Sequence, residues 1–310
     1  MDISIIIPLF NAKKFLERCV KSVALALKNF DGKCEIVIID NGSTDGSYKL
    51  AEKLAKDNSL ICLSKCPVAG AAAVRNFGIL EAKGKYVWFV DADDEVKPNS
   101  VTSLMKKAEE TTADLVMMGA TRVYTDGHTD YLSAVKPEEP NYKSRFVRYG
   151  AGPWQFLIRR KWWLEHGFKF REGIIHEDME IISSLILYTE NFSAVDEPLY
   201  IYYQNDDSVL HKKKWDPHYL DIFEALEGLY KRFEVAGMVD KYRGELEWFF
   251  IWNLLIDSAK DFAKFTEGRG GFERSREMLK KYFPTWRKNK FLRQKSFKLR
   301  IRVQLNYFKK

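Results

Sequence analysis

The chain has 310 residues, of which 46% are apolar and 30% are charged. This length exceeds a typical single domain, so we expect an α/β core with an appended part. The longest strongly apolar run, WFFIWNLLI at 248–256, falls well short of the roughly 20 residues that a membrane-spanning helix needs. The N-terminus has no secretory pattern and the four cysteines have no C-x-x-C spacing, which together predict a cytoplasmic protein with free cysteines.

Charge is unevenly distributed along the chain. The formal net charge is +7, but residues 280–310 alone contain twelve Lys or Arg and no Asp or Glu. The first 279 residues are therefore mildly acidic, and the basic character belongs to the C-terminal segment. Such a segment can bind nucleic acid, contact anionic lipid, or pack against the acidic part of the same protein.

The first third of the chain alternates short apolar runs with amphipathic segments. The runs are too short for helices and lack polar alternation, as expected for parallel strands covered on both faces. The expected strands are 3–10, 35–40, 60–64 and 86–90, and the expected helices are 13–27, 47–56 and 74–82. This order predicts a doubly wound α/β sheet.

The rest of the chain has weaker patterns. We expect a helix capped by Asn99 or Ser100. Further expected elements are a strand over 114–124, a loop or small hairpin over 125–150, a helix over 176–189, a strand over 194–204 and two helices between 215 and 265. The segment FKLRIRVQLNY at 297–307 alternates apolar with basic or polar residues, which predicts a strand with one apolar and one cationic face.

Acidic residues follow two of the expected strands. The run YVWFV is followed by DADDE at 91–95, and EIVIID ends in Asp40. A solvated turn or a helix N-cap would explain such acids without any ligand. In a doubly wound sheet, however, ligands bind outside the carboxyl ends of the strands, and clustered carboxylates repel each other unless a charge neutralises them. A divalent cation of the Mg²⁺ or Mn²⁺ type would do so, and an extended chain would point Asp91 and Asp93 the same way.

Other ligand motifs do not fit the sequence. A calcium-binding EF-hand loop starting at Asp91 would need Gly and Glu where the chain has Val96 and Thr102. The chain has no G-x-x-x-x-G-K-[ST] phosphate loop and no G-x-G-x-x-G dinucleotide motif.

Four segments in order resemble family 2 glycosyltransferases with the GT-A fold. The first, IIIPLFNAKKFLERCVKSV, resembles the P-x-[YF]-N opening motif; EIVIIDNGSTDGS, AAAVRNFGILEAKGKYVWFVDADDEV and HEDMEI resemble the motifs that follow. The resemblance covers residues 3 to about 205. It implies a Rossmann-like, mostly parallel sheet flanked by helices, with a helical C-terminal region. It also implies inverting transfer of a sugar from a nucleotide diphosphate donor to an acceptor hydroxyl.

The resemblance also implies roles for individual residues on the donor side. The nucleotide pocket would comprise Pro8, Asn11, Asp40 facing the base, Arg75 contacting the donor, Asp91 near the ribose or the metal, and Ala92. Asp93 would be the main ligand of Mn²⁺ or Mg²⁺ beneath the diphosphate. From the residues alone, Arg75 could equally form a surface ion pair, and Asn11 could close the first strand as a turn residue.

On the acceptor side, the resemblance makes Asp178 the general base. Glu177 would orient it, and His176 is a further candidate base or a polar helix cap. Without the resemblance, acids here would simply suit the first turn of a helix. Trp154 is a candidate platform for a sugar ring, or else a core residue. The chain has Gln155 and Phe156 where the family often has Asn and Lys, and His211 is a remote candidate for a second phosphate contact.

These expectations give three regions: a catalytic domain at 1–210, a helical region at 211–279 and a basic tail at 280–310. The predicted reaction is metal-assisted transfer from a UDP-sugar to a glycan or lipid-linked glycan. The resemblance favours peripheral contact of the tail with the anionic inner face of a membrane. The alternatives are a nucleotide-sugar-binding protein without turnover, and a nucleic-acid-binding protein that uses the tail.

Overall fold

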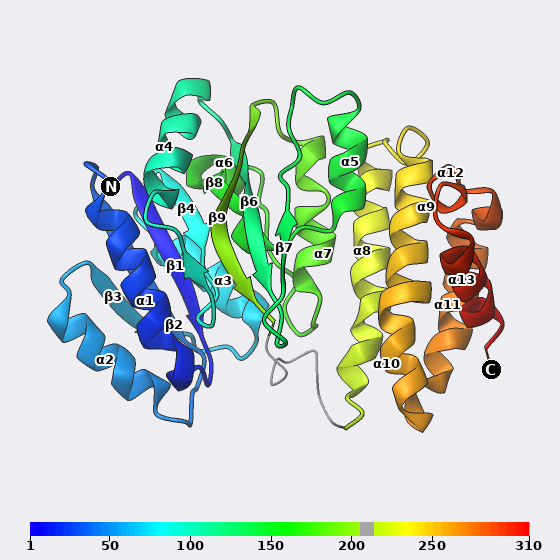
Figure 1. Ribbon diagram of the computed structural model, residues 1–310, viewed down its shortest axis with the longest axis horizontal. Coiled ribbons are helices and arrows are strands. Elements are labelled where there is room, and N and C mark those ends of the chain that lie inside the picture. Colours follow the sequence, from blue (N-terminus) through cyan, green and yellow to red (C-terminus); the bar gives the residue numbers. More distant parts are fainter. Residues whose placement is uncertain (205–213, 310) are drawn as a thin grey trace. The chain divides into compact units, whose positions relative to one another are not determined.

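The computed structural model describes residues 1–204 and 214–309. The chain forms two compact units (Figure 1). The sheet unit comprises residues 1–142, 152–173 and 189–206, and the helical unit comprises 143–151, 174–188 and 207–310. Segments 143–151 and 174–188, which the sequence places in the catalytic domain at 1–210, thus fall in the helical unit.

The sheet unit contains a nine-stranded sheet with the order β3-β2-β1-β4-β8-β6-β9-β5, and β7 pairs with β6. The strands are β1 (Ile3–Leu9), β2 (Cys34–Asp40), β3 (Ile61–Lys65), β4 (Tyr86–Phe89), β5 (Glu95–Val96), β6 (Leu115–Val123), β7 (Thr129–Leu132), β8 (Phe156–Arg159) and β9 (Phe192–Tyr203). The first four strands are parallel to one another, whereas β8 is antiparallel to both β4 and β6. The predicted α/β class is confirmed. The part of the sheet formed by the later strands, however, mixes parallel and antiparallel pairs instead of being mostly parallel.

Helices pack on this sheet through apolar stripes at helical spacing. They are α1 (Lys13–Lys28), α2 (Ser47–Asp57), α3 (Ala71–Glu81), α4 (Ser100–Thr111) and α6 (Arg160–Glu165). Helix α1 buries Leu16, Val20, Val23 and Leu27 in the core of the sheet unit. Helix α3 approaches the sheet closely at Gly78, where an added Cβ would lie 2.6 Å from Ile6.

The helical unit has an aromatic core and no strand in its described residues. Its longer helices are α8 (Asp221–Val235), α9 (Arg243–Trp252), α10 (Ser258–Lys264), α11 (Gly270–Tyr282) and α13 (Phe297–Phe308), and its shorter ones include α5 (Tyr142–Tyr149), α7 (Glu177–Ile182) and α12 (Lys290–Arg293). Residues 253–257 form a π-helical turn in which the Asn253 side chain donates to the Phe249 carbonyl oxygen. Among the described residues, no helix is both long and apolar enough to cross a membrane.

Two expectations for local structure are correct only in part. The segment 125–150 forms the expected hairpin, because β7 pairs antiparallel with β6, but it also contains helix α5. The helix expected over 176–189 ends at Ile182, and a short 3₁₀ turn follows at 185–187.

The alternating segment 297–307 is also not a strand, because it forms helix α13. Ser296 caps this helix by accepting a hydrogen bond from the Leu299 amide, and Asn306 donates to the Leu255 carbonyl oxygen. Val303 and Tyr307, one helical turn apart, are buried. The basic tail is therefore an integral part of the helical unit, and packing that buries one helical face overrides the period-two pattern.

Candidate active site

The carboxyl ends of three neighbouring strands meet at one edge of the sheet. Strand β1 lies between β2 and β4 and is parallel to both, with Leu9 opposite Asp40 and Ile6 opposite Phe89. Asp40 is the last residue of β2, and Asn11 and Asp91 follow β1 and β4. Predicted donor-side residues of the first three motifs thus converge at the edge that doubly wound sheets use for ligands.

Asn11 and Asp40 hold the loop that follows β2. The Asp40 carboxylate is buried and accepts hydrogen bonds from the backbone amides of Gly42 and Ser43, at 3.0 and 3.3 Å. Asn11 has a positive φ of 47°, which Asn tolerates better than most residues, and its Oδ1 accepts from the Thr44 amide at 2.8 Å. The turn role expected for Asn11 is confirmed. Pro8 lies within β1, opposite Ile39.

Asn41 was not singled out from the sequence, yet it links two loops of this edge. Its side chain donates to the Val68 carbonyl oxygen and accepts from the Gly70 amide, both at 2.8 Å. Gly70 precedes helix α3 and has a φ of 115°, which favours glycine. The contact spans 29 residues, and the only sequence signal for it is an Asn directly after Asp40.

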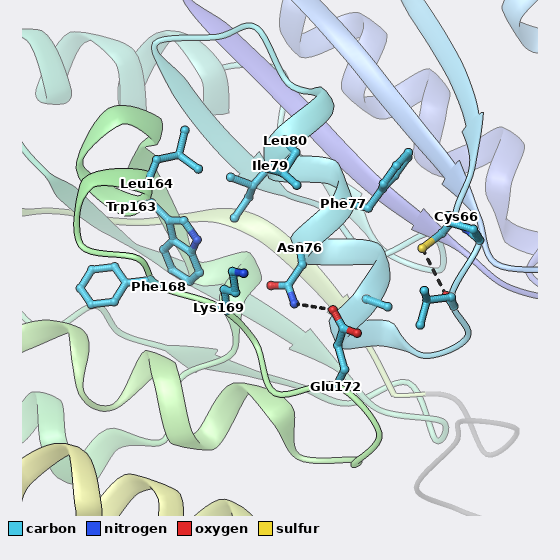
Figure 2. Close-up of a pocket in the computed structure, with 13 residues that line it drawn as sticks. Cys66, Asn76, Phe77, Ile79, Leu80, Trp163, Leu164, Phe168, Lys169 and Glu172 are labelled. Carbon is cyan, nitrogen blue, oxygen red and sulfur yellow. Dashed lines mark hydrogen bonds between the residues drawn. The ribbon is translucent and has the colours of Figure 1, made fainter.

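A small apolar pocket lies against α3 (Figure 2). It has a volume of about 220 Å³, and its lining includes Phe77 and Trp163. Asn76 donates to the Glu172 carboxylate at 3.2 Å at its rim. None of the predicted site residues lines this pocket.

Arg75 reaches the sheet edge from α3. It is only 9% exposed, and its Nη2 lies 3.4 Å from the Asp91 carboxylate. Its guanidinium carbon lies 5.7 Å from the centre of the Phe170 ring. Arg75 thus forms an ion pair, but a buried one rather than the surface pair considered from the sequence. Because a buried guanidinium cannot give up its charge, Arg75 is a fixed cation beside the acidic turn.

The chain turns between Asp91 and Asp94. The Asp94 amide donates to the Asp91 carbonyl oxygen at 3.1 Å, and Ala92 is buried in the core. The prediction that an extended D-A-D segment points Asp91 and Asp93 the same way by strand alternation is therefore wrong, because a turn replaces the strand there. Both side chains are partly exposed at this turn.

Asp94 is held inside the protein, at 1% exposure. Its two oxygens accept hydrogen bonds from the Tyr200 hydroxyl at 2.7 Å and the Tyr203 amide at 2.8 Å. Burial, reinforced by the charges of Asp91 and Asp93, raises the pKa of the Asp94 carboxyl well above its ordinary value. Asp94 therefore anchors the turn to β9 and is not available to a ligand.

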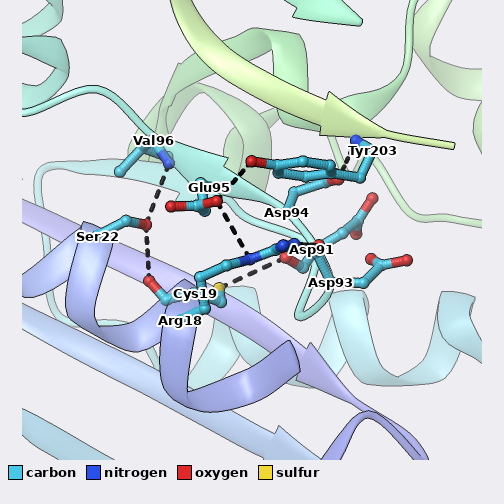
Figure 3. Close-up of polar contacts among 9 residues, drawn as sticks. All are labelled: Arg18, Cys19, Ser22, Asp91, Asp93, Asp94, Glu95, Val96 and Tyr203. Atoms are coloured by element: carbon cyan, nitrogen blue, oxygen red, sulfur yellow. Dashed lines mark hydrogen bonds and ion pairs between the residues drawn. The ribbon is translucent and has the colours of Figure 1, made fainter. Parts of the chain in front are cut away.

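Arg18 also secures the turn, from α1 (Figure 3). It donates to the Asp93 carbonyl oxygen at 2.6 Å and pairs with Glu95 at 3.1 Å. The Tyr203 ring lies 4.0 Å from its guanidinium, and the Tyr203 hydroxyl donates to Glu95 at 2.7 Å. Arg18 and the two tyrosines had no sequence signal, because their partners lie more than 70 residues away along the chain.

The acids at 91, 93, 94 and 95 do not depend on a bound cation alone to offset their mutual repulsion, contrary to the expectation from the sequence. Ion pairs or hydrogen bonds with protein groups already stabilise Asp91, Asp94 and Glu95. What the turn presents toward solvent is the pair Asp91 and Asp93.

The donor set of this pair fits a hard divalent cation. Mg²⁺ is commonly held by one or two carboxylates, with phosphate oxygens and water completing the shell. In the described residues, no group of three or more His, Cys, Asp or Glu side chains could hold a metal by itself. Asp91 and Asp93 therefore suit an ion whose other ligands come from a bound diphosphate, rather than a closed protein cage.

Trp154 lies in the core of the sheet unit. It is 8% exposed, and its ring stacks on Tyr200 at 4.5 Å and on Tyr202 at 5.4 Å between centroids. Its carbonyl oxygen accepts from the Trp88 indole at 2.7 Å. These contacts support the core alternative for Trp154 over a sugar platform, which would need an accessible ring face.

The predicted acceptor-side residues lie in the helical unit, at the start of α7. His176 occupies the N-cap position with a positive φ of 67°, and its side chain does not cap the helix. Burial lowers the pKa of His176, while Glu177, Asp221 and Asp257 oppose the shift. Glu177 is buried, whereas Asp178 is partly exposed in the first turn. His211 lies outside the described residues.

An α/β sheet with an acidic turn at its carboxyl edge is the architecture of the GT-A fold, and solved structures share this fold. An S. aureus TarS structure with UDP-GlcNAc matches with a TM-score of 0.78 at 19% identity, covering 99% of this chain and 89% of that one. The mannosyltransferase PcManGT from Pyrobaculum calidifontis, in complex with GDP-Man and Mn²⁺, matches with a TM-score of 0.53 at 15% identity, covering 98% and 86%.

Sequence comparison gives the family. The family described as "Glycosyl transferase family 2" matches residues 4–167. The glycosyltransferase EpsJ of Bacillus subtilis (strain 168) is 30% identical over 251 residues, which cover 76% of this chain and 71% of EpsJ. The chain therefore belongs to glycosyl transferase family 2 and is a glycosyltransferase of the bacterial polysaccharide type, as the motifs of the sequence indicate.

Proposed function

We propose that this glycosyltransferase moves a sugar from a UDP-sugar to a hydroxyl of a glycan or lipid-linked glycan, with inversion at the anomeric carbon. The observation that carries the proposal is the buried Arg75 paired with Asp91 at the sheet edge, beside Asp93. Arginine matches phosphate oxygens in bidentate fashion, and two carboxylates at the same turn suit a cation that a diphosphate completes.

The residues of the sheet edge would bind and orient the donor. Asp40 would accept a hydrogen bond from the base, next to the loop that Asn11 and Pro8 border. Arg75 would contact the diphosphate. Asp91 and Asp93 would hold Mn²⁺ or Mg²⁺, which when bound neutralises charge on the departing diphosphate.

Asp178 would serve as the general base. The acceptor oxygen attacks the anomeric carbon and its proton passes to the Asp178 carboxylate, while the bond from that carbon to the diphosphate oxygen breaks. The nucleoside diphosphate leaves with the electron pair, so the charge balances. Glu177 would orient this base. His176, with its lowered pKa, remains a further candidate that the same experiment tests.

UDP as the nucleotide is supported by TarS, whose structure holds UDP-GlcNAc, whereas PcManGT holds GDP-Man. Both proteins resemble this chain in fold only, and a binding measurement distinguishes the two nucleotides. A thermal-shift comparison of UDP, GDP, UDP-GlcNAc and GDP-Man, each with and without Mn²⁺, should give the largest stabilisation with a uridine nucleotide plus metal. Equal stabilisation without Mn²⁺ would remove Asp91 and Asp93 from the proposed metal site.

Turnover separates an enzyme of this mechanism from a nucleotide-sugar-binding protein. Asp178→Asn should abolish donor hydrolysis and transfer while UDP still raises the melting temperature. The matched control is Asp240→Asn, an exposed acid of the same unit. Retention of full turnover by Asp178→Asn would assign the base to another residue, and His176→Asn is the next variant to assay. Localisation at the inner face of a membrane stays a prediction, and its physical basis lies in α13.

A further inference from the structure

Helix α13 exposes a stripe of large apolar side chains. Phe297, Ile301, Leu305 and Phe308 are 70%, 42%, 67% and 65% exposed. Their spacing of four, four and three residues places them along one face of the helix, while Val303 and Tyr307 bury another face in the helical unit. A contiguous apolar surface that stays exposed, on a protein that buries most of its other large apolar side chains, marks an interaction site.

Arginines border this stripe. A groove of about 380 Å³ is lined by the four stripe residues and by Arg287, Arg293, Arg300, Leu292 and Gln304. None of these nine residues is acidic. Arg287 is fixed in place, because it donates to Gln304 at 3.1 Å and its guanidinium lies 4.5 Å from the Tyr307 ring. The groove thus combines apolar side chains with preoriented cations.

The charges of α13 are not matched within the protein. The helix carries Lys298, Arg300 and Arg302 and no acid, and in the described residues none of the three is within ion-pair distance of a carboxylate. By contrast, Lys281 pairs with Glu227 at 2.9 Å and Lys290 with Glu245 at 3.5 Å. Cations without an ion-pair partner therefore flank the apolar stripe.

We infer that this face of α13 is a docking surface for an anionic lipid bilayer. A helix of 12 residues is too short to span a bilayer, but an amphipathic helix with bulky apolar residues and flanking Lys or Arg binds in the interfacial plane. The stripe would enter the headgroup region while the arginines contact lipid phosphates. This inference does not depend on the donor, the metal or the base proposed above.

Charge and apolar contact together favour anionic lipid over a second copy of the chain or nucleic acid as the ligand of this stripe. A second copy of the chain, docked through the same face, would bring two strongly cationic surfaces together. Nucleic acid would match the cations but would leave the four apolar side chains in water. Anionic lipid satisfies both features, because attraction of about 1 kcal/mol for each nearby Lys or Arg adds to apolar insertion.

Vesicle sedimentation of the full chain tests the inference. Binding should be strong with phosphatidylglycerol-containing vesicles, weak with pure phosphatidylcholine, and reduced by salt. Ile301→Ser with Leu305→Ser should weaken binding by about tenfold for each side chain. Lys298→Gln with Arg300→Gln and Arg302→Gln should weaken it by about fivefold for each charge. All five positions are exposed, so the variants should keep the wild-type melting temperature.

Matched controls separate a specific face from net charge. Lys49→Gln with Lys53→Gln and Lys56→Gln removes three exposed charges from α2, and Val235→Ser removes an 86% exposed apolar side chain from α8. Both controls should bind vesicles as the wild type does. Equal binding by the α13 variants, or equal loss in the α2 control, would overturn the inference. So would a stripe-dependent dimer in sedimentation velocity, or α13-dependent binding of duplex DNA without vesicle binding.

Discussion

The Tyr200 hydroxyl donates a 2.7 Å hydrogen bond to the Asp94 carboxylate and also accepts one from the Asp91 amide at 3.1 Å. One buried side chain of β9 therefore fixes both ends of the acidic turn. Burial, reinforced by the neighbouring carboxyl groups of Asp94 and Asp91, raises the pKa of the Tyr200 hydroxyl well above its ordinary value, so this group remains a donor. The position of Asp91 and Asp93 thus depends on a residue that need not touch any ligand.

Tyr200→Phe should destabilise the protein by about 2 kcal/mol, because Asp94 and the Asp91 amide each lose a buried partner. Urea unfolding measures this change. Tyr48→Phe is the control, because the Tyr48 ring lies near Lys65 at the surface. Loss of the Tyr48 hydroxyl should change the free energy of unfolding by less than about 0.5 kcal/mol. Equal effects of both substitutions would mean that the hydrogen bonds of Tyr200 do not stabilise the turn.

His176 should make the helical unit less stable in mild acid. Burial lowers its pKa below the ordinary value of 6.5, so the unfolded chain binds a proton more readily than the folded one. The stability contributed by the neutral imidazole is present above pH 6.5 and is lost as the pH falls through and below that value.

His176→Asn should flatten this pH dependence between about pH 7 and pH 5. Asn tolerates the φ of 67° at this position, so the backbone should be retained. Urea unfolding at a series of pH values checks the slope. A wild-type slope in His176→Asn would assign the pH dependence to other groups.

The parts of the site that the sequence predicts are those encoded locally. Asp40 and Asp91 directly follow apolar runs, and parallel strands bring their carboxyl ends to one edge, so pattern and topology suffice. Arg18 and Tyr200 could not be found in this way, because each reaches the turn from a distant element. Helix α13 shows the converse, since its sequence alternates like a strand and only tertiary packing makes it a helix.

Arg75→Lys should weaken UDP binding by about tenfold, because an ammonium group cannot reproduce a bidentate contact with phosphate. The loss should appear in calorimetric titration with UDP and Mn²⁺, with little change for uridine, which has no phosphate. Arg269→Lys, an exposed change in the helical unit, should bind UDP normally. An equal loss for uridine and UDP would instead indicate that Arg75 only supports the fold around Asp91.

A substitution at Gly78 tests whether the packing of α3 against the sheet determines the position of Arg75. A Cβ at this residue would lie 2.6 Å from Ile6 and 2.9 Å from Ile39, both on the sheet beneath the helix. Gly78→Ala should therefore push α3 outward and destabilise the protein by about 1–3 kcal/mol, despite the higher helix propensity of alanine.

The same displacement should weaken UDP binding, because Arg75 lies one turn earlier on α3 and its 3.4 Å approach to Asp91 depends on the helix position. Urea unfolding and UDP titration of one preparation measure both effects. Gly270→Ala is the matched control, because a Cβ there meets nothing within 4 Å and should leave stability and binding unchanged. If Gly78→Ala lowers stability but keeps full UDP affinity, Arg75 does not contact the nucleotide from this helix position.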